Sequence, residues 1–167
     1  MSLPPLYWYP IFQALVLLIA ANGAPVITNK VLGNRLTRPM DNGLILADGY
    51  PLFGSRKTWR GLFSAVFFAS IVAILFGLQP LTGVLFGALT IAGDLIASFI
   101  KRRRGNVESS RARGLDTVPE SLLPLVLLKD SLALNLVDIV LIVGLFFLIE
   151  EWGSPLLYRL HIRDQPY

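Results

Sequence analysis

Residues 93–103 read GDLIASFIKRR, an apolar segment that carries one aspartate, Asp94, and ends in a run of basic side chains. An acidic side chain at membrane depth is costly and is rarely kept there without a function. Basic residues at the point where such a helix meets water can hold phosphate groups. The stretch therefore predicts a membrane helix at whose end phosphorylated substrates and a divalent metal ion are handled.

The composition around this stretch is that of a membrane protein. Hydrophobic residues make up 54% of the chain and the mean hydropathy is +0.62, whereas soluble proteins are about 45–50% apolar. A membrane span needs about 20 apolar residues, and long uncharged runs supply several. We expect an all-α integral membrane protein that forms a single domain over 1–167. Its five transmembrane helices are expected at about 6–27, 59–79, 80–100, 117–133 and 135–158.

The basic residues test this number of spans. With five spans the two ends of the chain lie on opposite sides of the membrane, and the loops 28–58 and 101–116 share one face with the C-terminal tail. Of the 15 basic residues, all but Lys129 then lie on that face. The positive-inside rule makes this face cytoplasmic, with the N-terminus outside and the C-terminus inside. We therefore expect a multi-pass protein of the plasma membrane whose two cytoplasmic loops form the active site.

Charge and residue counts also exclude several classes of function. The membrane topology accounts for the net charge of +4, so we expect no nucleic acid among the partners. The chain has no cysteine, which excludes disulfides, thiolate metal sites and thiol nucleophiles. Its one histidine, His161, argues against a Ser-His-Asp site. No basic segment precedes the first apolar run, so we expect the first helix to remain as an anchor.

Small and polar residues of the third predicted helix fall on one narrow face. They recur at intervals of three or four residues, which places them on one stripe of an α-helix. In chain order they are Gly83, Gly87, Thr90, Asp94, Ser98 and Lys101. Because glycines let a neighbouring helix approach closely, we expect this stripe to face the interior of the bundle. The alternative is that Asp94 makes an interhelical hydrogen bond or ion pair that only orders the bundle.

Two further carboxylates, Asp116 and Glu120, open the fourth predicted helix. They are four residues apart and so share one face, at the same cytoplasmic end as Lys101. Mg²⁺ prefers oxygen ligands and commonly bridges carboxylates to substrate phosphates, so Asp94, Asp116 and Glu120 are the candidate metal ligands. The alternative for Glu120 is structural, because Thr117-x-x-Glu120 has the form of a capping box.

A basic segment precedes the second predicted helix. Lys57, Thr58 and Arg60 combine cationic and hydroxyl side chains with the start of a helix. This combination suits a phosphate group, because backbone N–H groups at a helix start and nearby cations both attract anions. The alternative is that some of these charges serve only to set the topology.

The first and fifth predicted helices each carry a polar feature near the inner end. Asn22 and Pro25 could bend the first helix and expose its backbone groups to a cavity. Glu150 and Glu151 could balance the basic loops, or only end the fifth span at water. For both features we favour the purely structural interpretation.

Several of these segments together resemble one protein family. The chain is similar along almost its whole length to the CDP-archaeol synthase family, and residues 93–102 match the central motif of that family. The matching segments are 22–26 (NGAPV), 39–41 (PMD), 54–61 (GSRKTWRG), 93–102 (GDLIASFIKR), 115–116 (LD) and 158–167 (YRLHIRDQPY). The larger phosphatidate cytidylyltransferases share the central motif, but this chain lacks their long His-Gly-Gly signature.

The resemblance implies a five-span, Mg²⁺-dependent membrane enzyme that couples CTP to a lipid phosphate and releases a CDP-lipid and pyrophosphate. By position it implies catalytic roles for Asp94, Lys101 and Asp116. The substrate-binding positions that it implies are Lys57, Thr58, Arg60, Ser98 and Arg102. This chain departs from the family at Thr117 and Glu120, where archaeal members often carry a glutamine and a second aspartate, so the second metal carboxylate stays open.

Two alternatives to this function remain at the level of the sequence. The lipid phosphate could be phosphatidate or a polyprenyl phosphate rather than an archaeal ether lipid. A different class of function is a non-catalytic small membrane protein, such as a transporter subunit or a scaffold. A permeation path would bring polar groups to both faces of the membrane. Here nearly all of them lie toward one face, which favours the enzyme.

Overall fold

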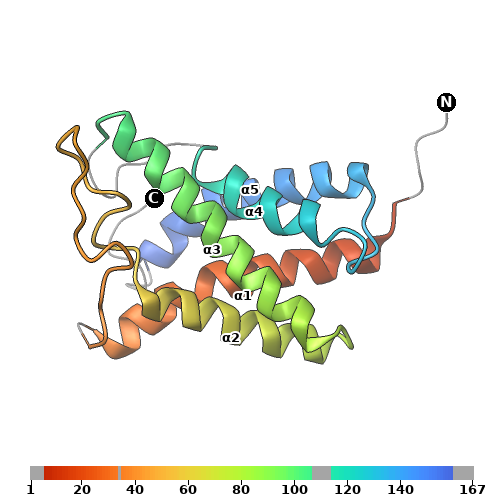
Figure 1. Ribbon diagram of the computed structural model, residues 1–167. Helices are drawn as coiled ribbons and strands as arrows, with labels where there is room; N and C mark the ends of the chain where they lie inside the picture. The colour runs from red at the N-terminus through yellow and green to blue at the C-terminus, as the bar shows by residue number, and fades with distance from the viewer. Residues whose placement is uncertain (1–5, 34, 107–113, 160–167) are drawn as a thin grey trace.

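The computed structural model describes residues 6–33, 35–106 and 114–159, with side chains as far as Gly153. The helices, drawn in Figure 1, are α1 (Trp8–Leu32), α2 (Trp59–Leu75), α3 (Pro80–Arg103), α4 (Thr117–Leu127) and α5 (Leu136–Arg159). Within these described residues the strand-like pairing consists of two isolated bridges ahead of α2. The predicted all-α class is therefore confirmed.

The helices pack into one bundle with an apolar interior. α2 packs against both α1 and α3, while α4 packs against α3 and α5. In Figure 1, α3 runs diagonally across the bundle, between α2 and the pair formed by α4 and α5. Leu17 and Leu18 of α1, Phe86 of α3, Leu125 of α4 and Phe146 of α5 are almost completely buried in a shared core. Their dispersion contacts are individually weak but together hold the helices in fixed positions.

Three glycines, Gly83, Gly87 and Gly93, allow α3 to approach its neighbours closely. A methyl group on Gly87 would lie 2.7 Å from the Cα of Val66 on α2, and one on Gly93 would lie 2.2 Å from the carbonyl oxygen of Pro119 on α4. Both separations are far below an ordinary contact of about 3.5–4.0 Å. Gly87 belongs to the stripe that the sequence predicts to face the bundle interior, and its contact with α2 agrees with that prediction. Gly93 lies outside that stripe and faces α4.

The helices differ in whether they can cross a membrane. Among the described residues, α1 and α3 are long and apolar enough to do so. Their lengths of 25 and 24 residues correspond to about 36 Å at 1.5 Å per residue, against a hydrocarbon core of about 30 Å. α2 and α4 are shorter apolar helices. With 11 residues, or about 16 Å, α4 cannot cross by itself, so the expected fourth full span is not formed by this helix alone.

The largest differences from the predicted helix boundaries lie at α1 and α4. α1 continues to Leu32 instead of ending at residue 27, because neither glycine nor proline occurs between residue 27 and Gly33, whose φ of 51° ends the helix. α4 ends at Leu127 instead of residue 133. The side chains of Lys129 and Asp130, which follow, are 48% and 94% exposed. The chain turns at these exposed charged groups instead of burying them in a longer apolar helix. Of the second predicted loop, residues 107–113 lie outside the described residues.

The loop between α1 and α2 is organised around Asp41. Its carboxylate accepts hydrogen bonds from the backbone N–H groups of Gly43, Phe53 and Gly54, each at 3.0 Å. Burial alone would raise the pKa of Asp41, but these N–H donors outweigh burial and lower the pKa below its ordinary value of 3.8. The ionised carboxylate thus holds two distant parts of the loop together.

The same loop is fastened to the end of α3. Arg103 forms an ion pair with Asp48 at 2.5 Å and donates a hydrogen bond to the carbonyl oxygen of Pro51 at 2.6 Å. In Figure 1 the loop lies at the end of the bundle where α1 and α3 finish and α2 begins. The loop therefore delivers its last residues, including Lys57, to a fixed place beside α3.

Candidate functional site

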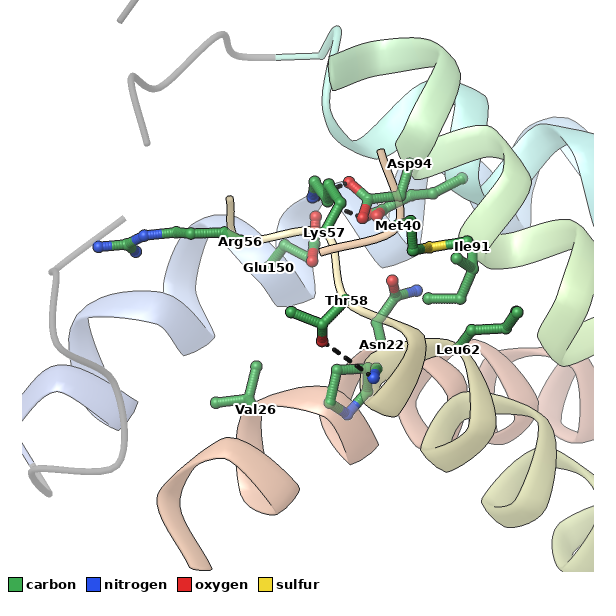
Figure 2. Close-up of a pocket in the computed structure, with 13 residues that line it drawn as sticks. Asn22, Val26, Met40, Arg56, Lys57, Thr58, Leu62, Ile91, Asp94 and Glu150 are labelled. Carbon is green, nitrogen blue, oxygen red and sulfur yellow. Dashed lines mark hydrogen bonds and ion pairs between the residues drawn. The ribbon is translucent and has the colours of Figure 1, made fainter. Parts of the chain in front are cut away.

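A cavity of about 200 Å³ lies at this end of the bundle, and Figure 2 shows its walls. All five helices and the loop contribute to it. The lining residues are Asn22, Pro25, Val26, Met40, Arg56, Lys57, Thr58, Gly61, Leu62, Ile91, Asp94, Glu120 and Glu150. Because every element supplies part of the wall, the cavity exists only in the assembled bundle.

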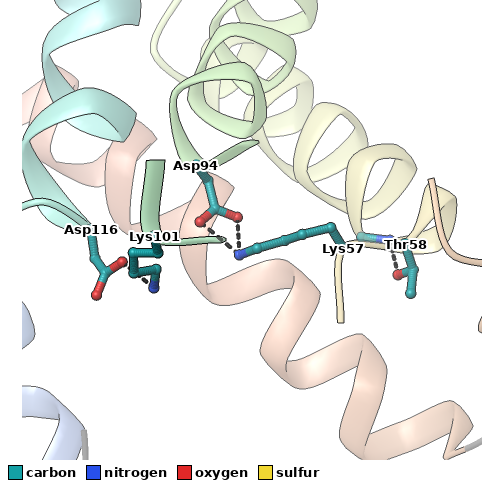
Figure 3. Close-up of polar contacts among 6 residues, drawn as sticks. Lys57, Thr58, Asp94, Lys101 and Asp116 are labelled. Atoms are coloured by element: carbon teal, nitrogen blue, oxygen red, sulfur yellow. Dashed lines mark hydrogen bonds and ion pairs between the residues drawn. The ribbon is translucent and has the colours of Figure 1, made fainter. Parts of the chain in front are cut away.

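An ion pair within the cavity joins the loop to α3. The Nζ of Lys57 lies 2.7 and 2.6 Å from the two carboxylate oxygens of Asp94 (Figures 2 and 3). Lys57 is held in place because the next residue, Thr58, is the N-cap of α2 and accepts a hydrogen bond from the N–H of Gly61 at 3.2 Å. The two charged side chains are 26% and 22% exposed. The pair is thus shielded from water yet accessible to a ligand in the cavity.

Two more carboxylates, Glu120 of α4 and Glu150 of α5, face the same cavity. Glu120 is 6% exposed and lies beside Glu150. The hydroxyl of Thr117 donates to Glu150 at 2.7 Å. The N-cap position of α4 is Asp116, which makes no side-chain capping bond. The capping box that was the structural alternative for Glu120 therefore does not form, and Glu120 belongs to the cavity wall.

A second ion pair lies between α3 and the start of α4. The Nζ of Lys101 lies 2.5 Å from Oδ1 of Asp116 (Figure 3). The structure thus separates the three predicted metal ligands, since Asp94 and Glu120 line the cavity whereas Asp116 contacts Lys101 outside its lining. Of the residues predicted to be catalytic, Asp94 lies at the cavity, and Lys101 and Asp116 form the adjoining pair.

The remaining predicted substrate-binding residues do not share one location. Thr58 lines the cavity. Arg60 instead donates hydrogen bonds to the carbonyl oxygen of Gly33 at 2.9 Å and to Oδ1 of Asn29, which clamps the end of α1 to the start of α2. Ser98 and Arg102 are 2% and 4% exposed on α3 and are not among the lining residues. Substrate binding by these last three residues stays a prediction.

Several lining residues were not predicted from the sequence. Arg56 belongs to the basic segment ahead of α2, in which the family resemblance implies Lys57, Thr58 and Arg60 as substrate-binding residues. Met40 lies in the PMD segment that carries the family resemblance, and Asn22 and Glu150 were given structural interpretations. The predicted five-span topology could have identified Glu150. It places the end of the fifth helix on the same side of the membrane as the polar end of α3.

Comparison with known proteins gives close relatives over most of the chain. The chain is 32% identical to the CDP-archaeol synthase of Sulfurisphaera tokodaii over 98% of this chain and 99% of that protein. It is 36% identical to the CDP-archaeol synthase of Hyperthermus butylicus over 62% of each. It is 30% identical to that of Saccharolobus solfataricus over 77% of this chain and 81% of the relative. No protein-family model matches the chain.

One solved structure shares the fold, that of an intramembrane enzyme for the biosynthesis of archaeal membrane lipids. The TM-score is 0.68 at 27% identity, with 83% of this chain and 90% of that chain covered. Together with the apolar helices, this similarity shows a membrane protein. Because 32% identity to a curated relative extends through nearly the whole of both chains, this protein belongs to the CDP-archaeol synthase family.

Proposed function

We propose that this protein is a CTP-dependent cytidylyltransferase that transfers the cytidylyl group of CTP to a membrane lipid phosphate, giving a CDP-lipid and pyrophosphate. The observation that carries this proposal is the Lys57–Asp94 pair, which lies inside a cavity at the basic end of an apolar bundle. The name of the relatives, CDP-archaeol synthase, supports an archaeal ether-lipid phosphate as the acceptor.

The reaction suits the side chains that line the cavity. An oxygen of the lipid phosphate attacks the α-phosphorus of CTP, and the bond from that phosphorus to the bridging oxygen of pyrophosphate breaks. The attacking oxygen is already an anion, so no base is required. The main obstacle is repulsion between two polyanions. Lys57 and Arg56 both line the cavity, where cationic side chains can neutralise phosphate charge.

The donors in the cavity fit Mg²⁺. Asp94 and Glu120 present carboxylate oxygens, and protein-bound Mg²⁺ usually takes one or two carboxylates together with substrate phosphates. Among the described residues no three carboxylate or imidazole groups form a metal cluster, so the nucleotide would have to complete the ligand set. When bound, Mg²⁺ would neutralise the departing pyrophosphate.

The two ion pairs have distinct roles in this proposal. Lys57 bonds both oxygens of Asp94, so the carboxylate can receive a metal ion only if the ammonium group turns away, toward the phosphates. Asp116 holds Lys101 at the adjoining end of α3, where the lysine can bind a phosphate group. The metal role that the sequence predicts for Asp116 would require it to leave Lys101.

We also propose that the cavity opens to the cytoplasm, with the N-terminus outside the plasma membrane and the C-terminus inside. The basic side chains at the cavity end of the described chain include Lys30, Arg35, Arg38, Arg56, Lys57, Arg60, Lys101, Arg102, Arg103 and Arg104. Lys129 follows α4, at the opposite end. This asymmetry supports a cytoplasmic cavity by the positive-inside rule.

The proposal is tested by pyrophosphate release from the detergent-purified full chain with CTP and Mg²⁺. Parallel reactions contain archaetidic acid, phosphatidic acid, a polyprenyl phosphate or no lipid. We expect release only with a lipid phosphate, fastest with archaetidic acid, and its loss when the metal is chelated. Folded protein that releases no pyrophosphate with any of the three lipids would contradict the proposal. Faster release with another lipid would change the substrate and keep the reaction.

A further inference from the structure

One part of the cavity wall, on α1, has no role in the chemistry described above. Asn22 lines the cavity there, and its Nδ2 donates a hydrogen bond to the carbonyl oxygen of Leu18 at 3.2 Å. Only the NH₂ end of the amide can bond to a carbonyl oxygen. The bond therefore fixes the amide, and Oδ1 is the polar atom that Asn22 presents to the cavity (Figure 2).

Pro25, three residues after Asn22, also lines the cavity and changes the hydrogen bonding of the helix. A proline has no N–H, so Pro25 cannot donate the helix hydrogen bond that the carbonyl oxygen of Ala21 would otherwise receive. Ala21 and Pro25 are four residues apart and so share one face of α1, and Pro25 lines the cavity. That carbonyl oxygen therefore receives no bond from Pro25, but Ala21 is fully buried and does not line the cavity, so Oδ1 of Asn22 is the acceptor that this segment of α1 presents there.

Thr58 supplies the complementary donor. Its hydroxyl oxygen accepts from the N–H of Gly61, and a hydroxyl in this arrangement still has its own hydrogen to donate. Val26, Leu62 and Ile91 provide apolar surface to the same cavity. Apolar walls with a few fixed polar groups are typical of sites that bind flat organic ligands.

We propose that Asn22 and Thr58 recognise the base of the nucleotide. Oδ1 of Asn22 accepts a hydrogen bond from the 4-amino group of cytosine, and the Thr58 hydroxyl donates to ring atom N3. This inference rests on the proposed function, because it takes CTP as the nucleotide. Uracil has a carbonyl oxygen in place of the amino group and an N–H at position 3. Its carbonyl oxygen would meet the acceptor Oδ1 of Asn22, and its N–H would meet the donor hydroxyl of Thr58. A site built in this way rejects UTP.

The test compares CTP with zebularine 5′-triphosphate, which has the same ring without the 4-amino group. Binding of each nucleotide to the full-length, detergent-purified protein is measured by calorimetry in the presence of Mg²⁺. For the natural sequence we expect CTP to bind about tenfold more tightly, the usual worth of one hydrogen bond. In Asn22→Leu, which nearly preserves side-chain volume, CTP should bind as weakly as the analogue.

Gln13→Leu is the matched control. Gln13 is also a buried amide on α1, but it bonds to the carbonyl oxygen of Phe76 at the other end of the helix. This variant should keep the tenfold difference. Equal affinity of the natural sequence for both nucleotides would overturn the inference without any variant, as would an Asn22→Leu protein that still discriminates tenfold. Binding of neither nucleotide would overturn the proposed function as well, whereas CTP-dependent turnover without discrimination would overturn base recognition alone.

Discussion

Two aspartates, Asp94 and Asp138, show how differently one residue type is used in this bundle. Asp138 is completely buried near the start of α5. It accepts from the N–H of Asn135 at 3.1 Å, while Oδ1 of Asn135 accepts from the N–H of Asp138 at 3.0 Å. This reciprocal arrangement caps a helix end. Asp94, by contrast, bonds a lysine that lies 37 residues away in the sequence.

The difference between the two aspartates lies in their partners. Asp138 is bonded to the backbone three residues earlier, and this bond can stabilise only the start of its own helix. Asp94 is bonded to Lys57, a cation brought in by a loop, and both line a cavity. An acid in a membrane helix indicates function most strongly when its partner comes from elsewhere in the chain and can be exchanged for a ligand.

The largest expected effect comes from comparing substitutions of two lysines, Lys57 at the cavity end of the bundle and Lys129 at the opposite end. Lys57→Met removes the cation that pairs with Asp94 and can neutralise substrate phosphate. We expect kcat/KM for lipid-dependent pyrophosphate release to fall by about 10²–10³-fold. Lys129→Met is the control, because the side chain of Lys129 is 48% exposed and pairs loosely with Asp130 at 4.0 Å. Similar losses in both variants would show that charge in general, rather than the cavity lysine, supports the reaction.

An intermediate effect concerns the contact between α3 and α4 beside Asp94. Gly93→Ala would place a methyl group 2.2 Å from the carbonyl oxygen of Pro119, so we expect the free energy of unfolding to fall by about 1–3 kcal/mol. Gly144→Ala on α5 is the control, since a methyl there meets no atom within 4 Å and should stabilise by about 0.5–1 kcal/mol. Equilibrium unfolding in detergent measures both, and equal stability of the two variants would contradict the close packing.

The smallest effect concerns Asp41, an acid outside the helices. Its pKa is lowered from 3.8 in the folded protein, so the ionised form stabilises the loop. That stabilisation is complete above the ordinary pKa and is lost as the pH falls through the lower folded value. Hydrogen exchange corrected for intrinsic rates should show a less protected loop at about pH 3 than at about pH 5. In Asp41→Asn, protection should be weak at both pH values, and an unchanged pH response would contradict this role.

Local patterns in the sequence predicted the features that depend on local geometry. The helical period of the third helix placed Asp94 on the inward face, and the basic segment before a helix start identified Lys57 and Thr58. Arg60 belongs to the same segment, but it lies two residues beyond the N-cap, on a part of the helix that turns toward the end of α1. Sequence spacing alone did not distinguish residues that line the cavity, such as Lys57 and Thr58, from Arg60, which bonds to the end of α1.

Features that depend on packing between distant helices were not predictable in the same way. The position of Glu150 beside Glu120 requires α5 to return along α4, and a single glutamate at the end of an apolar segment fits equally well with a span that ends at water. The early end of α4 depends on Lys129 and Asp130 staying exposed. In the sequence, apolar residues flank these two charges on both sides, and the predicted helix therefore continued through them to residue 133.

The most direct test of the account compares Asp94→Asn with Asp138→Asn in the same preparation. Pyrophosphate release and equilibrium unfolding are measured for both variants. We expect Asp94→Asn to lose at least about 10²-fold in rate and about 1 kcal/mol or less in stability. We expect Asp138→Asn to keep its rate and to stay within about 1 kcal/mol of the natural stability, because the amide oxygen of asparagine can still accept from the N–H of Asn135. Full turnover by Asp94→Asn, or loss of turnover by a folded Asp138→Asn, would contradict the assignment of function to Asp94.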